Sequence, residues 1–433
     1  MSDTAGTSPA DPAGGGALGP GSGASASGAG LPRHRRRRWM RGAGLGAAAL
    51  LVVAAGTGWA VYVKLDGNIT PDEAAAAELA RFERERPTAL VREARNILLI
   101  GSDSRSGEEN ARYGRDPGTE RSDTAILLHL PAGRGSATAV SLPRDLMVDV
   151  PGCLRRGGGR TEPVFAMFNQ AFEWGGSACA IRTVEKLTGI RVDHHVVVDF
   201  QGFKKMVEAV DGVEVCLREP IDDKAAELKL PAGRVTLNGE QALGYVRARK
   251  SLGDGSDTHR MERQQRFLGA LVNKASGNDV LLNPAKLYPV LDAATSALTT
   301  DPGLASLRGL YELVRGLRDI PAERVQFLTV PREPYTNDAN RDQLSQPEAE
   351  ALFERLRRDA PVTVAQGRGS ATGAGAGSGS GSGAPSGNPD DENTEGDAKV
   401  TRNESGEQPE EVAEAASPAP TFSGNTAAED TCA

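Results

Sequence analysis

Aromatic, histidine and cysteine side chains are scarce in this 433-residue sequence, which has 4% aromatics, 5 His and 4 Cys. No G-x-S-x-G, H-E-x-x-H or C-x-x-C motif occurs, which excludes the usual signatures of serine hydrolases and zinc sites. Outside one arginine run near the N-terminus, no basic stripe interleaved with aromatics is present. Nucleic acid is therefore not expected as a partner.

Composition divides the chain unevenly. Residues 1–30 are mostly Gly, Ala, Ser and Pro and cannot bury a core. From residue 366 onward a Gly/Ser-rich stretch passes into an acidic one, which predicts a flexible tail. The roughly 250–280 residues between them suffice for one large α/β domain.

Residues 43–63 carry no charge over 21 positions, and as a helix they cover about 30 Å, the thickness of one hydrocarbon core. Six arginines stand just before this span, between Arg33 and Arg41. The positive-inside bias then predicts a single-pass cell-membrane protein with a cytoplasmic N-terminus and everything after Lys64 outside the cell. A cleaved signal peptide is the alternative, but the span is longer than a usual h-region of ~7–15 residues and no clean A-x-A site follows it.

Short, nearly continuous apolar runs alternate with amphipathic segments after the span. The predicted strands are NILLIG, DTAILLHL, TAVSLP, HHVVVDF, VEVCL and RVQFLTVP. Predicted helices are residues 70–86, which begin with the capping sequence TPDE and lift the domain off the bilayer, and residues 177–187, 201–210, NGEQALGYVRAR and THRMERQQRFLGALVNKA. This pattern predicts an α/β fold with a central mixed sheet flanked by helices on both faces.

The predicted organisation has six parts. They are a disordered N-terminus with an arginine flank (1–42), a transmembrane helix (43–63), a juxtamembrane helix and linker (64–90), the main domain (91–335), its C-terminal helix and edge (336–365), and a disordered tail (366–433).

In an exported domain, cysteines indicate disulfides rather than reactive thiols. Cys153 and Cys179 flank a Gly-rich loop and a helix start, and closing that loop would contribute roughly 3–4 kcal/mol. Cys216 has two interpretations: it pairs with Cys432 across the tail, or it is a small buried hydrophobe.

Carboxylates and guanidiniums gather where predicted strands end, the edge at which α/β sheets bind ligands. Asp103 follows NILLIG, Asp123 opens the next strand and Asp145 follows the third. Asp103 and Asp123 could hold Mg²⁺ (or Mn²⁺), although any one such Asp more often only caps a turn. Candidate phosphate-binding side chains are Arg105, Arg121, Arg144, Arg247, Arg249, Arg260 and Gln264. Several converging guanidiniums with Mg²⁺ fit a diphosphate, whereas the alternative is a solvated basic helix face.

The sequence contains the following motifs, in this order: NILLIGSDSR, RSDT, SLPRD, DGVEVCL, LPAGRVTLNGEQALGYVRARK and SD-x-x-RMERQQRFL. Through these motifs it resembles the LytR-CpsA-Psr family over roughly residues 93–335. The resemblance implies a phosphotransferase that moves a teichoic-acid-like or other wall glycan from a polyprenyl diphosphate carrier to peptidoglycan, with the lipid tail in an apolar tunnel between sheet and helices. The Gly, Ala and Arg content is typical of an actinobacterial source.

The resemblance also implies residue roles. Asp103 and Asp123 match magnesium-binding aspartates, and Gln264 matches a residue lining the head-group site. The matching phosphate-binding arginines are Arg121, Arg144, Arg247, Arg249 and Arg260, while His259 stands where the family often has Gly.

In the implied reaction an acceptor hydroxyl attacks phosphorus and polyprenyl phosphate leaves. Arg144 and Arg249 neutralise charge, and Asp145 and Asp257 are candidate general bases. Three alternatives remain: a hydrolase that uses water at the same site, a non-catalytic membrane regulator, and a wall-binding module.

Overall fold

The computed structural model describes residues 33–103, 121–224, 226–248, 257–275, 283–366, 420–429 and 432. The chain forms two compact units, one ending at Val61 and the other beginning at Tyr62. Helix α1 (Arg33–Asn68) begins in the first unit. Its segment Ala43–Asn68 is the one candidate membrane span, by length and hydropathy, among the described residues.

The second unit contains the remaining elements. Its strands are β1 (Thr70–Pro71), β2 (Arg95–Ser102), β3 (Ser122–Leu130), β4 (Ala137–Leu142), β5 (Met147–Val150), β6 (Val164–Met167), β7 (His194–Asp199), β8 (Val213–Leu217), β9 (Ile221–Asp223), β10 (Leu228–Leu230), β11 (Gly233–Leu237), β12 (Leu298–Thr300), β13 (Val325–Thr329), β14 (Arg332–Tyr335), β15 (Asp338–Leu344), β16 (Thr363–Gln366) and β17 (Thr421–Thr426). Its helices are α2 (Glu73–Arg81), α3 (Phe168–Thr188), α4 (Phe200–Ala209), α5 (Gly239–Arg247), α6 (Asp257–Ala275), α8 (Pro284–Ala297), α9 (Leu307–Arg318), the 3₁₀ turn η2 (Ala322–Arg324) and α10 (Glu348–Arg357).

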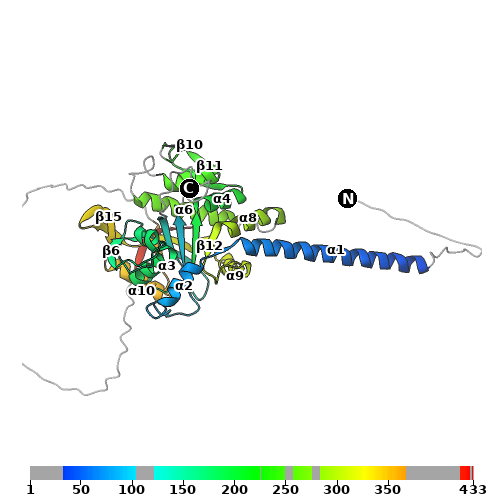
Figure 1. Cartoon of the computed structure of the whole chain (residues 1–433). Coiled ribbons are helices and arrows are strands. Elements are labelled where there is room, and N and C mark those ends of the chain that lie inside the picture. The colour runs from blue at the N-terminus through cyan, green and yellow to red at the C-terminus, as the bar shows by residue number, and fades with distance from the viewer. Residues whose placement is uncertain are drawn as a thin grey trace, which may run out of the picture. The chain divides into compact units, whose positions relative to one another are not determined.

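In the part of the chain described, the main sheet has nine strands in the order β1-β12-β7-β2-β3-β4-β13-β17-β16. Strands β2 and β7 are parallel, as are β4 and β13, whereas β3 is antiparallel to both β2 and β4. This mixed sheet, with helices packed on both sides, confirms the predicted fold class (Figure 1).

The two faces of the sheet are packed differently. Alternate residues of the central strands, such as Leu98 and Leu127, are fully buried under α2, α3 and α10. On the opposite face, Leu99, Leu128 and Val198 are only partly buried beneath α6 and α9. One face is therefore sealed, and the other leaves apolar strand surface incompletely covered.

A second apolar cluster lies beside the sheet. It joins α4 and α5 to the hairpins β8–β11 and β9–β10, and it includes the buried Phe267 of α6. Helix α6 thus packs against both the sheet and this cluster, which fixes its position between them.

The juxtamembrane segment differs from the prediction of a spacer. Helix α2 is shorter than expected, Asp72 caps its start, and Ala75 and Leu79 are buried in the main core. Leu65 and Ile69 are buried as well. These apolar side chains are buried in the domain, so residues ahead of the predicted boundary at residue 91 contribute to its core.

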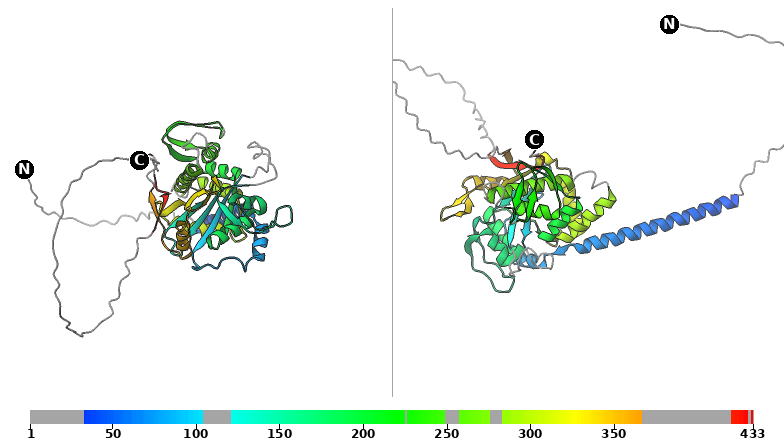
Figure 2. Two further views of the ribbon diagram at one scale, coloured as in Figure 1. Left: turned by 90° about the vertical axis from the view of Figure 1, so that its left-hand side faces the viewer. Right: turned by 90° about the horizontal axis from the view of Figure 1, so that it is seen from above.

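The C-terminal region also differs from the prediction of a disordered tail over residues 366–433. Of that stretch the structure describes residues 366, 420–429 and 432, and β17 lies inside the main sheet between β13 and β16 (red in Figure 2). Phe422 is buried in the core, and Cys432 forms a disulfide with Cys216. Strand β17 is therefore part of the domain, and of the two interpretations of Cys216 the structure supports the disulfide.

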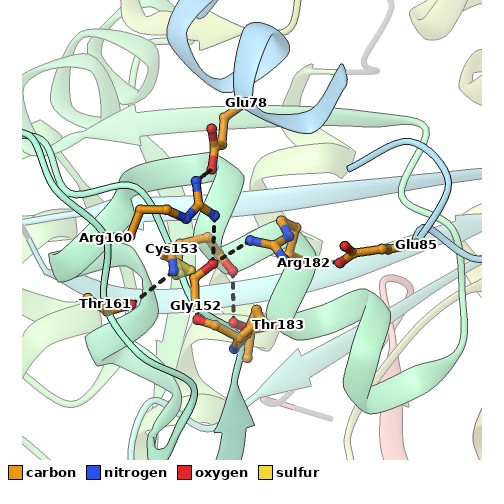
Figure 3. Close-up of a disulfide and its surroundings, with 10 residues drawn as sticks. Glu78, Glu85, Gly152, Cys153, Arg160, Thr161, Arg182 and Thr183 are labelled. Atoms are coloured by element: carbon orange, nitrogen blue, oxygen red, sulfur yellow. Dashed lines mark hydrogen bonds and ion pairs between the residues drawn. A yellow bond between two sulfur atoms is a disulfide. The ribbon is translucent and has the colours of Figure 1, made fainter. Parts of the chain in front are cut away.

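The predicted disulfide between Cys153 and Cys179 is confirmed, with a Cα–Cα distance of 5.6 Å (Figure 3). Two arginines stabilise the loop beside this disulfide. Arg160 Nη2 and Arg182 Nη1 donate hydrogen bonds to the Gly152 carbonyl at 3.0 and 2.7 Å. Helix α3 passes the disulfide at Gly175, where an added Cβ would lie 2.7 Å from the Cβ of Cys179. The close approach explains why glycine stands there.

Candidate active site

Three strand ends meet at one edge of the sheet, as the sequence predicted. The end of β2 pairs with the start of β3, where Ser102 lies opposite Ser122. Just beyond this pair, Asp103 Oδ1 accepts a hydrogen bond from the Arg121 amide at 2.6 Å, and the Asp103 amide donates to the Arg121 carbonyl at 2.9 Å. These bonds bring Asp103 beside the strand that carries Asp123.

Arg144 connects two of the predicted acids. It follows β4, and its Nη1 lies 3.0 Å from Asp123 Oδ1 while its Nε lies 3.2 Å from Asp145 Oδ2. The Arg144 side chain is 19% exposed, so these pairs lie at the margin between protein and solvent. Arg144 therefore holds both carboxylates in place.

Helix α6 covers this edge. Arg260 is buried, and together with Gln264 it lines a small cavity with Asp123 and Arg144. The cavity has a volume of about 10 Å³, room for little more than a water molecule. A diphosphate would therefore have to displace or turn the side chains that now fill the space.

Three consecutive side chains of α6 fix the helix in position. Arg263 donates to the Ala248 carbonyl, Gln264 Nε2 donates to the Val246 carbonyl at 3.2 Å, and Gln265 Nε2 donates to Ser141 Oγ at 3.0 Å. Burial, the largest effect, lowers the pKa of Arg263. The region is thus poorly solvated, which strengthens electrostatic attraction to an anion.

Two other predicted arginines lie outside this cavity. The Arg121 guanidinium pairs with Glu173 of α3, Nε to Oε2, at 3.0 Å. The Arg247 guanidinium carbon lies 4.7 Å from the ring centre of Phe200, which follows β7. Because β7 runs parallel to β2, Arg247 is at the same sheet edge but on the far side of β2 from Asp123.

Some predicted residues cannot be placed. Arg105 and Arg249 lie outside the described residues, and the side chain of Asp257, at the start of α6, is outside them as well. Their predicted roles stay predictions.

Two polar residues at the start of α3 were not among the predicted site residues. Glu173 pairs with Arg121, and Asn169, one helical turn before it, donates its backbone amide to the Arg144 carbonyl at 3.0 Å. The Asn169 Oδ1 atom is buried and has no hydrogen-bond partner among the described residues. An apolar-polar pattern beginning eight residues before Gly176 could have extended the predicted helix to include both.

Asp103 and Asp123 are the candidate ligands for a hard cation at this edge. No group of three or more His, Cys, Asp or Glu side chains suited to a metal occurs within the described part of the chain. Magnesium, however, is commonly bound by one or two carboxylates, with water and substrate phosphate completing the shell. Asp103 and Asp123 on neighbouring strand ends fit that pattern.

The chain is similar to several known proteins. The profile of the LytR_cpsA_psr family matches residues 65–358. A relative from Corynebacterium glutamicum, named probable cell wall biosynthesis protein LcpB, is 38% identical over 60% of this chain and 61% of its own. The Bacillus subtilis polyisoprenyl-teichoic acid–peptidoglycan teichoic acid transferase TagT is 29% identical over 66% of this chain and 84% of its own.

Among solved structures, a LytR-Csp2A-Psr enzyme from Actinomyces oris superposes with a TM-score of 0.50 at 23% identity, covering 63% of this chain and 93% of that one. This likeness concerns the fold. The chain spans about three fifths of the length of the Corynebacterium relative.

Proposed function

The chain belongs to the LytR_cpsA_psr family, and from that premise we propose that it is a phosphotransferase that moves a wall glycopolymer from a polyprenyl diphosphate carrier to peptidoglycan. The relatives support the substrate class, since one is named for cell wall biosynthesis and another for teichoic acid transfer to peptidoglycan.

One observation carries the proposal: a cavity at the sheet edge is lined by Asp123, two guanidiniums and Gln264. Arg260 lines this cavity and is only 3% exposed, and its permanently charged guanidinium is suited to an anionic ligand there. Arg144 can reach phosphate oxygens with directional, charge-assisted bonds once it turns from Asp123.

The incompletely sealed sheet face supports the lipid part of the proposal. Along α6, Met261 lines the cavity, and Leu268, two turns further on, packs with Leu99 and Leu128 of the sheet. This apolar strip leads away from the charged cavity. A diphosphate bound among the arginines would place its polyprenyl tail along the strip.

The chemistry follows from charge. The acceptor hydroxyl attacks the phosphorus that bears the glycan, the phosphoanhydride bond breaks, and polyprenyl monophosphate leaves with the bond electrons. Arg144 and Arg260 would stabilise negative charge on the phosphoryl and leaving oxygens. Asp103 and Asp123 would hold Mg²⁺, which supplies further charge neutralisation when bound. Asp145, which pairs with Arg144, would accept the hydroxyl proton.

The location follows the same proposal. Residues 43–63 would span the cell membrane once, with the arginine-rich N-terminus in the cytoplasm and the second unit outside, where peptidoglycan lies.

Lipid that co-purifies with the full-length protein tests the substrate class. Mass spectrometry of extracts should detect polyprenyl phosphate or diphosphate with the unaltered protein and much less with Arg260→Ala. Arg160→Ala is the matched control, since Arg160 pairs with Glu78 beside the Cys153 loop. Extracts without polyprenyl lipid, or equal amounts in both variants, would contradict the proposal.

A further inference from the structure

Residues just beyond the apolar span are bound to helices α8 and α9. Lys64 Nζ donates to Tyr288 Oη at 2.9 Å and pairs with Asp292 Oδ1 at 2.9 Å. Asp66 Oδ1 accepts a hydrogen bond from the Leu307 amide, the first residue of α9, at 2.8 Å. Both helices are thus held to the last turns of α1.

These contacts join α8 and α9 to the chain directly beyond the apolar span. Asp66 lies three residues after Val63, so at ~1.5 Å per residue it stands roughly 4–5 Å beyond the hydrocarbon core. The polar layer on each side of that core is roughly 5–8 Å thick. The start of α9 is therefore hydrogen-bonded to a residue only three positions beyond the apolar span.

The two faces of α9 differ. The inner face carries Leu310, Leu313 and Leu317 toward the sheet. The outer face carries large apolar side chains in contact with solvent: Tyr311 is 63% exposed and Val314 is 57% exposed. They are three residues apart, so they lie side by side on the helix surface.

The outer face of α9 carries more arginine than acid, which suits an anionic surface. Arg308 and Arg315 flank the two apolar side chains, and Arg308 pairs with Glu312 at 3.0 Å. Glu312 is the one acid in α9, against three arginines in its sequence. Tyrosine with arginine on an amphipathic helix is typical of segments that lie in the interface of an anionic bilayer.

We propose that the outer face of α9 docks on the head-group layer of the membrane that α1 spans, with anionic phospholipid as its partner. The inference rests on the proposed membrane anchor. Docking inserts Tyr311 and Val314 at the acyl boundary. It holds the second unit at the bilayer surface, whereas without docking this unit would be connected to the membrane only through the anchor helix. The lipid-linked substrate, which also resides in the bilayer, would then meet a domain of fixed height.

Spin labels test this in the full-length protein reconstituted into phosphatidylcholine–phosphatidylglycerol vesicles. The native cysteines form two disulfides, so one introduced cysteine provides the only thiol. Labels at Tyr311→Cys and Val314→Cys should collide several-fold more with oxygen, which dissolves in lipid, than with an aqueous nickel chelate. Val272→Cys is the matched control, because Val272 is a 40% exposed valine on α6, and its label should favour the nickel chelate.

A label at Val53→Cys, inside the span, separates the two proposals. If Val53 reports lipid while the α9 labels behave like Val272, the anchor stands and docking is wrong. If Val53 itself reports water, the anchor fails and the inference fails with it. Labels on α9 shielded from both reagents would indicate a protein partner, such as a second copy, and would overturn membrane docking. Vesicles of phosphatidylcholine alone should reduce the lipid signal at Val314 and leave that at Val53 unchanged.

Discussion

Replacing Arg144 with lysine should abolish most transfer while leaving the fold intact. Lysine keeps the positive charge at this position but has one ammonium group in place of a planar fork. In the structure the fork contacts Asp123 through Nη1 and Asp145 through Nε. A single ammonium cannot bridge both carboxylates as the fork does here, and it cannot present two parallel donors to a phosphate once it turns from Asp123.

The size of the effect follows from those contacts. Hydrogen bonds to charged groups contribute about 1.5–3 kcal/mol each, so loss of one or two in the transition state amounts to roughly 3 kcal/mol. That corresponds to about a hundredfold lower rate. The effect on folding should stay below about 1 kcal/mol, because the paired side chains are 19%, 31% and 22% exposed and such partly solvated pairs add little stability.

The assay compares kcat with a lipid diphosphate glycan donor and a peptidoglycan acceptor, while circular dichroism follows the fold. Arg86→Lys is the control: Arg86 pairs with Glu185 at 2.8 Å and is 10% exposed, and its replacement should lower the melting temperature without slowing transfer. Near-normal transfer by Arg144→Lys would refute the role of the bidentate guanidinium.

Three further predictions concern the metal, the chain end and pH. Asp123→Asn and Asp103→Ala should each abolish most transfer and its dependence on added Mg²⁺. A titration of transfer rate against magnesium concentration measures this, and titration curves equal to those of the unaltered protein would exclude a shared site. Cys432→Ser should lower unfolding stability by up to about 5 kcal/mol, since the lost disulfide closes a separation of 216 residues, and urea titration with and without reductant measures this. Burial favours neutral Asp72, but hydrogen bonds from His195 and a backbone amide outweigh it and lower its pKa from 3.8 to about 2. This depressed value adds about 2 kcal/mol of stability above pH 4, which should be lost as pH falls from about 4 to 2, and Asp72→Asn should flatten that part of the pH–stability curve.

Strand positions were predictable because buried strands are short, continuous apolar runs, and their ends determine where polar side chains gather. NILLIG, DTAILLHL and TAVSLP became β2, β3 and β4, and Asp123 and Arg144 met at their common edge. The i and i+4 spacing of Arg260 and Gln264 likewise placed both on the cavity side of α6.

Composition was a poor guide where few residues decide the outcome. Residues 421–426 follow a long polar stretch, which predicted disorder. They form a strand because their backbone pairs with the sheet and the one aromatic side chain among them, Phe422, is buried in the core. Helix α2 was predicted to be a spacer because an alanine-rich segment gives no clear sequence signal of burial. In the structure Ala75 and Leu79 pack in the core. Asn169 and Glu173 were not predicted because the expected helix began only at residue 177. Their contacts with Arg144 after β4 and with Arg121 before β3 are tertiary.

Acceptor-dependent formation of polyprenyl monophosphate tests the central claim most directly. Full-length protein in vesicles would receive a lipid diphosphate glycan labelled in the sugar, with or without peptidoglycan, and both the released lipid and the wall-bound label would be measured. We predict one polyprenyl monophosphate for each glycan attached to peptidoglycan, and neither product without acceptor or with Arg144→Lys. Monophosphate and free glycan phosphate released without peptidoglycan would instead identify a hydrolase, and the absence of turnover under any condition would contradict an enzymatic role.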